Sequence, residues 1–166
     1  LGGTAIDAAY GIKWAPSGAF YVTGGTRSSN LPAKTGAYKG TLSGIEDGFI
    51  AKFSNDRFEQ LTYLGTDSAD VAYLVDIDAE ENVYTIGLTR GRYTTTTGTY
   101  RNLNAGQFIH ALDKNLSSTV FSTTIGSNRA RPDISPTAFL VNECGNIYFS
   151  GWGGAVNIRN RNNPYS

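Results

Sequence analysis

The chain has 166 residues, and its 14 Lys and Arg residues balance 14 Asp and Glu residues, so its formal net charge is zero. This balance excludes the strongly basic surface expected of a nucleic-acid-binding protein. No apolar run approaches the ~20 residues of a membrane-spanning helix, so we expect neither a nucleic-acid partner nor membrane insertion.

The residue types favour an all-β fold. The chain has 20 glycines and 10 tyrosines. Tyr, Thr, Val, Ile and Phe are strand formers, whereas Gly supplies tight turns between strands. The sequence lacks Met and opens on Leu1-Gly2-Gly3, which has a later copy in Leu64-Gly65-Thr66. We therefore expect it to be a piece of a longer protein.

The first 63 residues predict four short strands. Tyr10, Ile12 and Trp14 alternate with smaller or polar residues, which is the period-two pattern of a strand. Residues 15–18 contain Pro and Gly where a turn would need them. The strands expected in this unit are 10–14, 20–24, 47–53 and 58–64.

A long connection joins the second and third of these strands, from Thr26 to Glu46. It exceeds the ~12–15 residues beyond which structureless loops become uncommon. Two interpretations stay open: the connection packs down as an ordered excursion, or it carries function.

The second unit repeats the plan of the first, with strands expected around 73–77, 82–87, 107–112 and 119–126. The third unit contributes only half its length. Its first half has one extra residue after Asp133, which we expect a bulge near Ser135-Pro136 to absorb. Residues 1–63 thus form the first repeat, 64–124 the second, and 125–166 a partial third repeat with a loop-like tail.

One short phrase recurs in all three units, with Tyr21, Tyr84 and Tyr148 spaced by 63 and 64 residues and Gly three residues after each. A fixed period of this size indicates stacked copies of one supersecondary unit. Four short antiparallel strands per unit are typical of a β-propeller blade. We predict a partial β-propeller of about two and a half blades. Because rings close with about four to eight blades, the chain should need the remaining blades of its parent chain, or a partner, for stability.

The blocks 17–24, 30–32, 47–53 and 61–65, taken in this order, resemble the bacterial SBBP repeat, a family named for its inferred seven-bladed β-propeller. Residues 144–154 resemble the version found in large surface proteins of gliding bacteria, which are often exported by the type 9 secretion system. The resemblance implies an extracellular or cell-surface, non-enzymatic protein. Such a protein would serve as an adhesin or scaffold and contact surface glycans or other surface and secretion-system proteins.

One turn departs from this pattern. Glu81 occupies the position of Gly18 in the first unit and Gly145 in the third. A left-handed backbone conformation is strained at Glu, so we expect this hairpin to use a different turn type.

Three aspartates recur at the start of each unit: Asp7, Asp70 and Asp133. They could form a ring of carboxylates that binds a cation or a basic partner. Alternatively, each accepts backbone hydrogen bonds at the entry to a first strand, as in Asx turns. We favour the second interpretation, because a binding site needs only one copy.

Other polar residues are assigned structural roles. The segment 76–82 has oxygen ligands at alternate positions, as Ca²⁺ prefers, but it lacks the Gly of a calcium loop, so we expect a solvated acidic turn. His110 is the only histidine and is predicted to lie in the core or at a blade interface rather than to act in catalysis. Cys144, the only cysteine, is predicted to be a buried thiol.

The candidate binding residues are Arg90, Arg92, Tyr93 and Tyr100, in the long connection of the second unit. With the threonine run 94–97 they could form a polar surface on which glycans stack, and the alternative is an extended solvated loop. We predict no catalytic residue, cofactor or metal. A different class of function, a propeller enzyme that cleaves glycans as a lyase or hydrolase, would require catalytic residues partly outside this chain.

Overall fold

The computed structural model describes residues 1–129 and 131–153, and these residues form ten strands and no helix. Sheet 1 contains β1 (Asp7–Trp14), β2 (Phe20–Thr26), β3 (Asp47–Ser54) and β4 (Arg57–Leu64). Sheet 2 contains β5 (Asp70–Ile77), β6 (Val83–Thr89), β7 (Gln107–Leu112) and β8 (Thr119–Ile125). Sheet 3 contains β9 (Ser135–Val141) and β10 (Ile147–Trp152).

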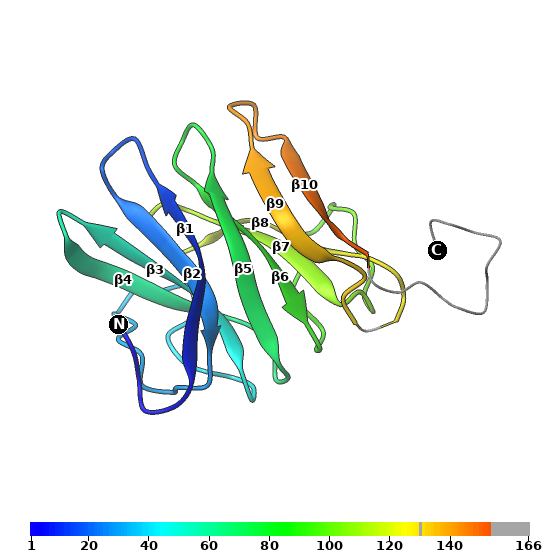
Figure 1. Cartoon of the computed structure of the whole chain (residues 1–166), viewed down its shortest axis with the longest axis horizontal. Coiled ribbons are helices and arrows are strands. Elements are labelled where there is room, and N and C mark those ends of the chain that lie inside the picture. The colour runs from blue at the N-terminus through cyan, green and yellow to red at the C-terminus, as the bar shows by residue number, and fades with distance from the viewer. Residues whose placement is uncertain (130, 154–166) are drawn as a thin grey trace.

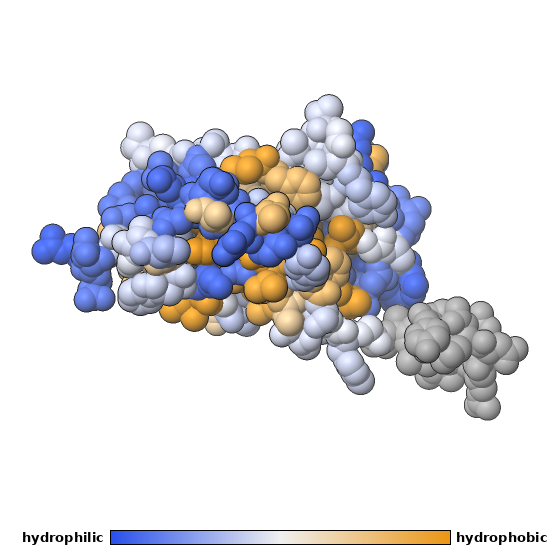
Figure 2. All heavy atoms as spheres, turned by 90° about the horizontal axis from the view of Figure 1, so that it is seen from above, coloured by the Kyte–Doolittle hydropathy of each residue, from blue (hydrophilic) through white to orange (hydrophobic). Residues whose placement is uncertain are grey.

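All three sheets are open and antiparallel, and within each sheet every strand pairs with the next one along the chain (Figure 1). The predicted all-β class is confirmed, and the eight strands expected in the first two units are present. The predicted tail at 157–166 lies outside the described residues. Tight hairpins join β1 to β2, β5 to β6 and β9 to β10 at one rim, onto which Figure 2 looks and where hydrophobic residues lie exposed among hydrophilic ones.

The sheets stack face to face through apolar side chains. Between sheets 1 and 2, Tyr21 and two alanines of the β1–β2 hairpin meet the apolar face of β5, β6 and β7. The cluster comprises Ala15, Ala19, Tyr21, Ile50, Leu64, Val75, Ile77, Val83, Leu112 and Leu116. Between sheets 2 and 3, a smaller cluster forms around Tyr84, Ala111 and Val141. Each buried aliphatic side chain contributes about 1.5–3 kcal/mol to this packing.

A bulge interrupts the first strand of every sheet, at Tyr10, Tyr73 and Thr137. The bulge expected near Ser135-Pro136 is therefore present, but it does not absorb the extra residue of the third unit, because the other two units share it. The extra residue lies instead between Asp133 and the bulge. As a result β9 begins two residues after Asp133, whereas β1 and β5 begin at their aspartates.

The hairpin at Glu81 was expected to use a different turn type, but it has the same turn as the other two units. Glu81 has a φ of +64°, in the same left-handed region as Gly18 and Gly145. Its N–H donates to the Asp78 carbonyl over 3.1 Å, and one oxygen of the Asp78 carboxylate accepts the N–H groups of Glu80 and Asn82. The prediction was wrong because the Asp78 carboxylate organises the turn and offsets a backbone strain of about 1–3 kcal/mol.

The long connections are ordered and cover the outer edges of sheets 1 and 2. In the first unit, Tyr63 of β4 donates its N–H to the Lys39 carbonyl over 2.9 Å, and its hydroxyl accepts the Leu31 N–H over 3.0 Å. In the second unit, Thr96 donates its N–H to Ser122 of β8 over 2.9 Å. Of the two interpretations of the first connection, the structure therefore supports an ordered excursion that also satisfies an outer edge strand.

Candidate binding site

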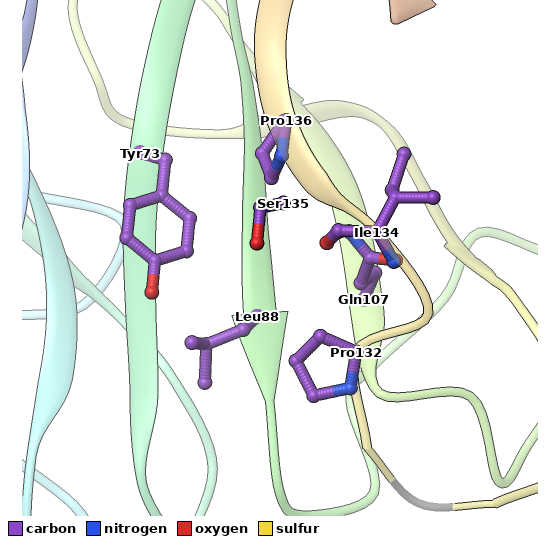
Figure 3. A pocket seen from close by; sticks show the side chains of 7 residues that line it. All are labelled: Tyr73, Leu88, Gln107, Pro132, Ile134, Ser135 and Pro136. Atoms are coloured by element: carbon purple, nitrogen blue, oxygen red, sulfur yellow. The ribbon is translucent and has the colours of Figure 1, made fainter. Parts of the chain in front are cut away.

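The rim opposite the tight hairpins carries the long connections and the links between sheets (Figure 1). We call it the connection rim and define it as residues 27–46, 65–69, 90–106, 126–129 and 131–134. A pocket of about 250 Å³ opens beside this rim, between sheets 2 and 3. Its lining, drawn in Figure 3, comprises Tyr73, Leu88, Gln107, Pro132, Ile134, Ser135 and Pro136.

The pocket exists because two residues break the repeat. At the junction of sheets 1 and 2, the positions equivalent to Leu88 and Gln107 are Gly25 and Gly48. A Cβ at Gly48 would lie 2.9 Å from the Ala72 nitrogen, so the sheets meet there through bare backbone. At the second junction, two full side chains and the extra residue before the bulge of β9 hold the sheets apart.

At the second junction, the Gln107 side chain makes the hydrogen bonds that the main chain makes at the first. Between sheets 1 and 2, the Asp70 N–H donates to the Glu46 carbonyl over 2.8 Å, in a short parallel bridge. Between sheets 2 and 3, the buried Gln107 amide oxygen accepts the N–H groups of Asp133 and Ile134, each over 3.2 Å, and its nitrogen donates to the Ile134 carbonyl over 3.1 Å. The amide is thus occupied within the chain and shapes the pocket.

The pocket wall is mainly apolar and aromatic, with Tyr73 on one side and two prolines on the other. Burial raises the pKa of the Tyr73 phenol, and the Arg90 guanidinium acts in the opposite direction. The phenol is therefore neutral at physiological pH. The seven described residues that line the pocket include no carboxylate, imidazole or thiol, so the wall that they form is suited to hold an apolar or aromatic group.

The pocket was not predicted from the sequence, because its residues belong to strands and links rather than to a recognisable motif. The available signal was the replacement of Gly25 by Leu88 and of Gly48 by Gln107 between two otherwise similar units. A polar residue with a long side chain at a position where the other copy tolerates only Gly indicates a local change in packing.

The structure separates the four candidate binding residues. Arg90 and Arg92 are exposed on the connection rim, where Arg90 is close enough to influence the Tyr73 phenol. Tyr100 is exposed as well, but its carbonyl accepts the hydroxyl of Thr123 on β8, the outer strand. It therefore lies away from the pocket, which is bounded by β5, β6, β7 and the start of β9.

Tyr93 is buried, which corrects its assignment as a stacking group for glycans. Its ring stacks on Phe108 with centroids 4.1 Å apart, and its hydroxyl lies 3.0 Å from Nδ1 of His110. Although it belongs to a connection, the chain turns it inward because Phe108 and His110 of β7 offer an aromatic surface and a polar partner.

The threonine run 94–97 lies along the outer edge of sheet 2. Ser122 donates its hydroxyl to the Thr94 carbonyl over 2.7 Å and its N–H to the Thr96 hydroxyl over 2.9 Å. With Tyr38 and Thr119, the run also lines a shallow hollow of about 360 Å³. The run is therefore an ordered edge segment, and the alternative of an extended solvated loop does not describe it.

His110 lies at the interface of the first two units, as predicted. Its Nε2 is 2.8 Å from the Thr119 hydroxyl, and the ring of Tyr38, from the long connection of the first unit, approaches edge-on with centroids 5.1 Å apart. Burial lowers the pKa of His110 to about 4. The ring is therefore neutral at pH 7, with both nitrogens engaged by hydroxyl groups.

The three repeated aspartates accept backbone hydrogen bonds. Asp7 accepts the Gly3 N–H over 2.7 Å, Asp70 accepts the Thr66 N–H over 2.6 Å, and Asp133 accepts the Ser127 N–H. These contacts support the structural interpretation over a ligand-binding ring. In residues 1–129 and 131–153, no group of three His, Cys, Asp or Glu side chains is placed to hold a metal ion.

The acidic segment 76–82 is less solvated than expected. Asp76 is buried, and its carboxylate lies 2.7 Å from the Lys13 ammonium of sheet 1 and accepts the Val141 N–H of sheet 3 over 2.7 Å. Asp78 is buried inside its own turn. The prediction failed because the stacking of sheets on both sides converts an apparently open turn into an interface.

Cys144 is exposed, so the prediction of a buried thiol is wrong. It lies in the β9–β10 hairpin, where its N–H donates to the Asn142 side-chain oxygen over 3.0 Å. A hairpin tip of this kind projects beyond the stacked faces, where no apolar neighbour covers a side chain.

Neither a protein-family model nor a curated protein matches this chain. Among the described residues, no helix has the length and apolar character needed to cross a bilayer.

Proposed function

We propose that the chain is a non-catalytic β-propeller module of an extracellular or cell-surface protein, which binds or scaffolds other molecules. One observation supports the propeller part of the proposal: on the side of the β1–β2 hairpin and its equivalents, corresponding sheet faces are buried where a sheet precedes them, whereas Ile12 and Trp14 of sheet 1, which no described sheet precedes, are exposed. We call this the leading face, made of residues 12, 14 and 20 in sheet 1, 75, 77 and 83 in sheet 2, and 139, 141 and 147 in sheet 3.

The exposure of one equivalent position makes the pattern clear. Trp14 on sheet 1 is 62% exposed, whereas Ile77 on sheet 2 is 8% exposed and Val141 on sheet 3 is 6% exposed. All three residues are apolar, so each sheet has an apolar side chain at the position where a preceding sheet would pack. Repetition of one packing unit along an axis is the construction principle of propellers and solenoids.

The resemblance to the SBBP repeat favours a propeller over a solenoid and supports an extracellular location. A binding role is supported by the way polar groups are used within the chain. Gln107, His110 and Asp76 are buried polar side chains that break the repeat, and each one is engaged by other groups of the chain. What remains open to a partner is the connection rim, with Arg90, Arg92 and the adjoining pocket.

Binding at the connection rim is tested on a glycan array and with candidate surface proteins. We expect the variant Arg90→Ala/Arg92→Ala to lose at least tenfold in apparent affinity, because both guanidinium groups are exposed on the connection rim and can pair with anionic or polar groups of a partner. Arg57→Ala is the matched control, since Arg57 is an exposed arginine on β4 outside the connection rim. Equal loss in both variants would contradict a specific site, and glycan turnover abolished by one carboxylate substitution would replace the binding role with an enzymatic one.

A further inference from the structure

The shallow hollow at the outer edge of sheet 2 is separate from the pocket beside Gln107. It has a volume of about 360 Å³, and its lining comprises Tyr38, Thr94, Thr95, Thr96, Thr97, Thr119 and Ser122. Tyr38 belongs to the long connection of the first unit, and the other lining residues belong to the second unit. The hollow therefore lies where two four-stranded sheets and their connections meet, rather than at either end of the stack.

Tyr38 gives the hollow an aromatic wall that is held in place. Its N–H donates to the Leu116 carbonyl over 2.8 Å, and its ring approaches His110 edge-on with centroids 5.1 Å apart. The side chain is half-buried, so the protein fixes one part of the ring while another part lines the hollow. A ring that is ordered in advance offers an apolar surface to a ligand at little cost in conformational entropy.

The buried pair of Tyr93 and His110 sets the direction of a hydrogen bond at the hollow. The Tyr93 hydroxyl lies 3.0 Å from Nδ1 of His110, and the Thr119 hydroxyl lies 2.8 Å from Nε2. Burial raises the pKa of Tyr93 well above its ordinary value, so the phenol keeps its proton. A buried O–H that donates to no acceptor is strongly disfavoured, and we therefore assign the phenol as the donor to Nδ1. The neutral ring then carries its proton on Nε2 and donates it to the Thr119 hydroxyl oxygen.

This direction makes Thr119 a hydrogen-bond donor toward the hollow. Because its oxygen accepts the proton of Nε2, its own hydrogen is available to an acceptor outside the protein. The phenol, the imidazole and the hydroxyl form a chain in which each bond polarises the next, and Thr119 itself is exposed. None of the seven lining residues is charged, so the lining offers no counter-charge to an ionic ligand.

We propose that the hollow binds a neutral sugar residue, whose C–H face packs on the Tyr38 ring while one of its oxygens accepts the Thr119 hydroxyl. Sugar rings combine apolar C–H faces with hydroxyl groups at their edges. The hollow combines the same two features, because the threonines at 94–97 add methyl and hydroxyl groups beside the aromatic wall. The inference rests on the binding role of the proposed function. It adds a ligand class that differs from the anionic or polar groups expected at Arg90 and Arg92.

The test is a titration of the ¹⁵N-labelled 166-residue chain with neutral disaccharides built from glucose, galactose, mannose and N-acetylglucosamine. Each sugar is added up to about 50 mM, and binding is followed by the ¹H–¹⁵N shifts of the backbone amides. We expect at least one disaccharide to give saturable shifts at residues 94–97 and 119, with a dissociation constant of about 1–10 mM. Absence of saturable shifts for every disaccharide would overturn the proposal, as would saturable shifts confined to other residues.

Substitutions at Thr119 test its role as the donor. Thr119→Val removes the hydroxyl at nearly constant volume and should raise the dissociation constant about fivefold or more, whereas Thr119→Ser should stay within about twofold of the wild type. Thr41→Val is the matched control, since Thr41 is an exposed threonine of the first connection outside the hollow. The amide spectra also show that each variant is folded. Unchanged affinity in Thr119→Val, or an equal loss in Thr41→Val, would refute the assigned contact.

The tautomer of His110 provides a test that needs no ligand. His110 is the only histidine, so its ring signals in long-range ¹H–¹⁵N spectra are unambiguous. We expect the proton on Nε2, and a proton on Nδ1 would overturn the assignment of Thr119 as a donor to the ligand.

The variant Arg90→Ala/Arg92→Ala distinguishes this site from binding at the two arginines. It should bind the neutral disaccharide as the wild type does, because neither arginine lines the hollow. Loss of the disaccharide in this variant would contradict a separate sugar site. Failure of the hollow to bind any disaccharide would leave the effect of the arginines on the glycan array unchanged, so the two proposals fail independently.

Discussion

The two junctions between sheets use the same backbone plan and reach different results. At the junction of sheets 1 and 2, small residues such as Gly25 and Gly48 bring the backbones together, and a parallel main-chain bridge joins the sheets. At the junction of sheets 2 and 3, Leu88 and Gln107 occupy those positions, the Gln107 amide replaces the main-chain bridge, and a pocket opens. The comparison shows that a repeat fixes where sheets lie, whereas single side chains at the seam decide whether the seam is closed or hollow.

The largest expected effect comes from removing the tyrosine that seals each junction. We expect Tyr21→Ala to lower the free energy of unfolding by about 4 kcal/mol, because it leaves a large cavity and an unpaired Lys114 carbonyl, the acceptor of the Tyr21 hydroxyl. Tyr84→Ala, at the partly open junction, should cost about 2–3 kcal/mol. Tyr148→Ala should stay within about 0.5 kcal/mol, as for exposed residues.

Urea unfolding measures this series. The order Tyr21, Tyr84, Tyr148 follows from their burial alone. Equal losses at Tyr21 and Tyr148 would contradict the difference between an internal and an end face.

The next effect concerns pH and the first junction only. The folded pKa of His110, about 4, lies below the value of about 6.5 for a free histidine. The unfolded chain therefore binds the proton first as the pH falls, and stability is lost between pH 6.5 and 4 by about 3 kcal/mol at most. His110→Gln should flatten the pH dependence of unfolding in this window.

Carboxylates also contribute to the pH dependence of stability, and their contribution has to be distinguished from that of His110. Although burial acts to raise it, hydrogen bonds from Ser117 and Ser118 lower the pKa of Asp113 to about 2, so its stabilising contribution is lost below pH 3.8. Burial raises the pKa of Asp70, which acts with the opposite sign, since its proton is bound more tightly in the folded chain. Because both groups are present in the wild type and in His110→Gln, the difference between their unfolding curves isolates His110, and parallel curves from pH 6.5 to 4 would refute its role.

The smallest of the three effects tests the second junction. Gln107→Ala removes the acceptor of two backbone N–H groups, and we expect a loss of about 2 kcal/mol. Hydrogen exchange at the amides of Asp133 and Ile134 should accelerate, while exchange within sheet 1 stays unchanged. Gln60→Ala is the control, because its amide lies at the outer edge of sheet 1 and should not alter exchange at these two amides. Unchanged exchange in Gln107→Ala would show that the bridge is not what joins the sheets.

Much of the fold could be predicted from the sequence because each strand carries its own alternation and its own turn. The eight strands of the first two units and the interface position of His110 follow from these local signals. The repeated aspartates could be assigned because a contact that recurs in every unit reflects the backbone that the units share.

The errors concern features that depend on neighbouring sheets. Asp76 appears solvated in the sequence, yet sheets 1 and 3 cover it from two sides. Tyr93 lies in a connection but turns into the aromatic surface of β7, and the pocket beside Gln107 depends on segments far apart in the chain. The error at the Glu81 turn has a local cause instead. The left-handed backbone conformation of Glu81 is offset by the Asp78 carboxylate, three residues earlier in the same turn.

The long connections along β4 and β8 have a consequence for the outer edges of the first two sheets. By hydrogen bonding to the outer strands, as from Tyr63 to Lys39 and from Thr96 to Ser122, they occupy part of the ladder to which a strand of another molecule could add. Lateral growth through β4 and β8 is thereby disfavoured, so the connections protect these two strands against β-aggregation.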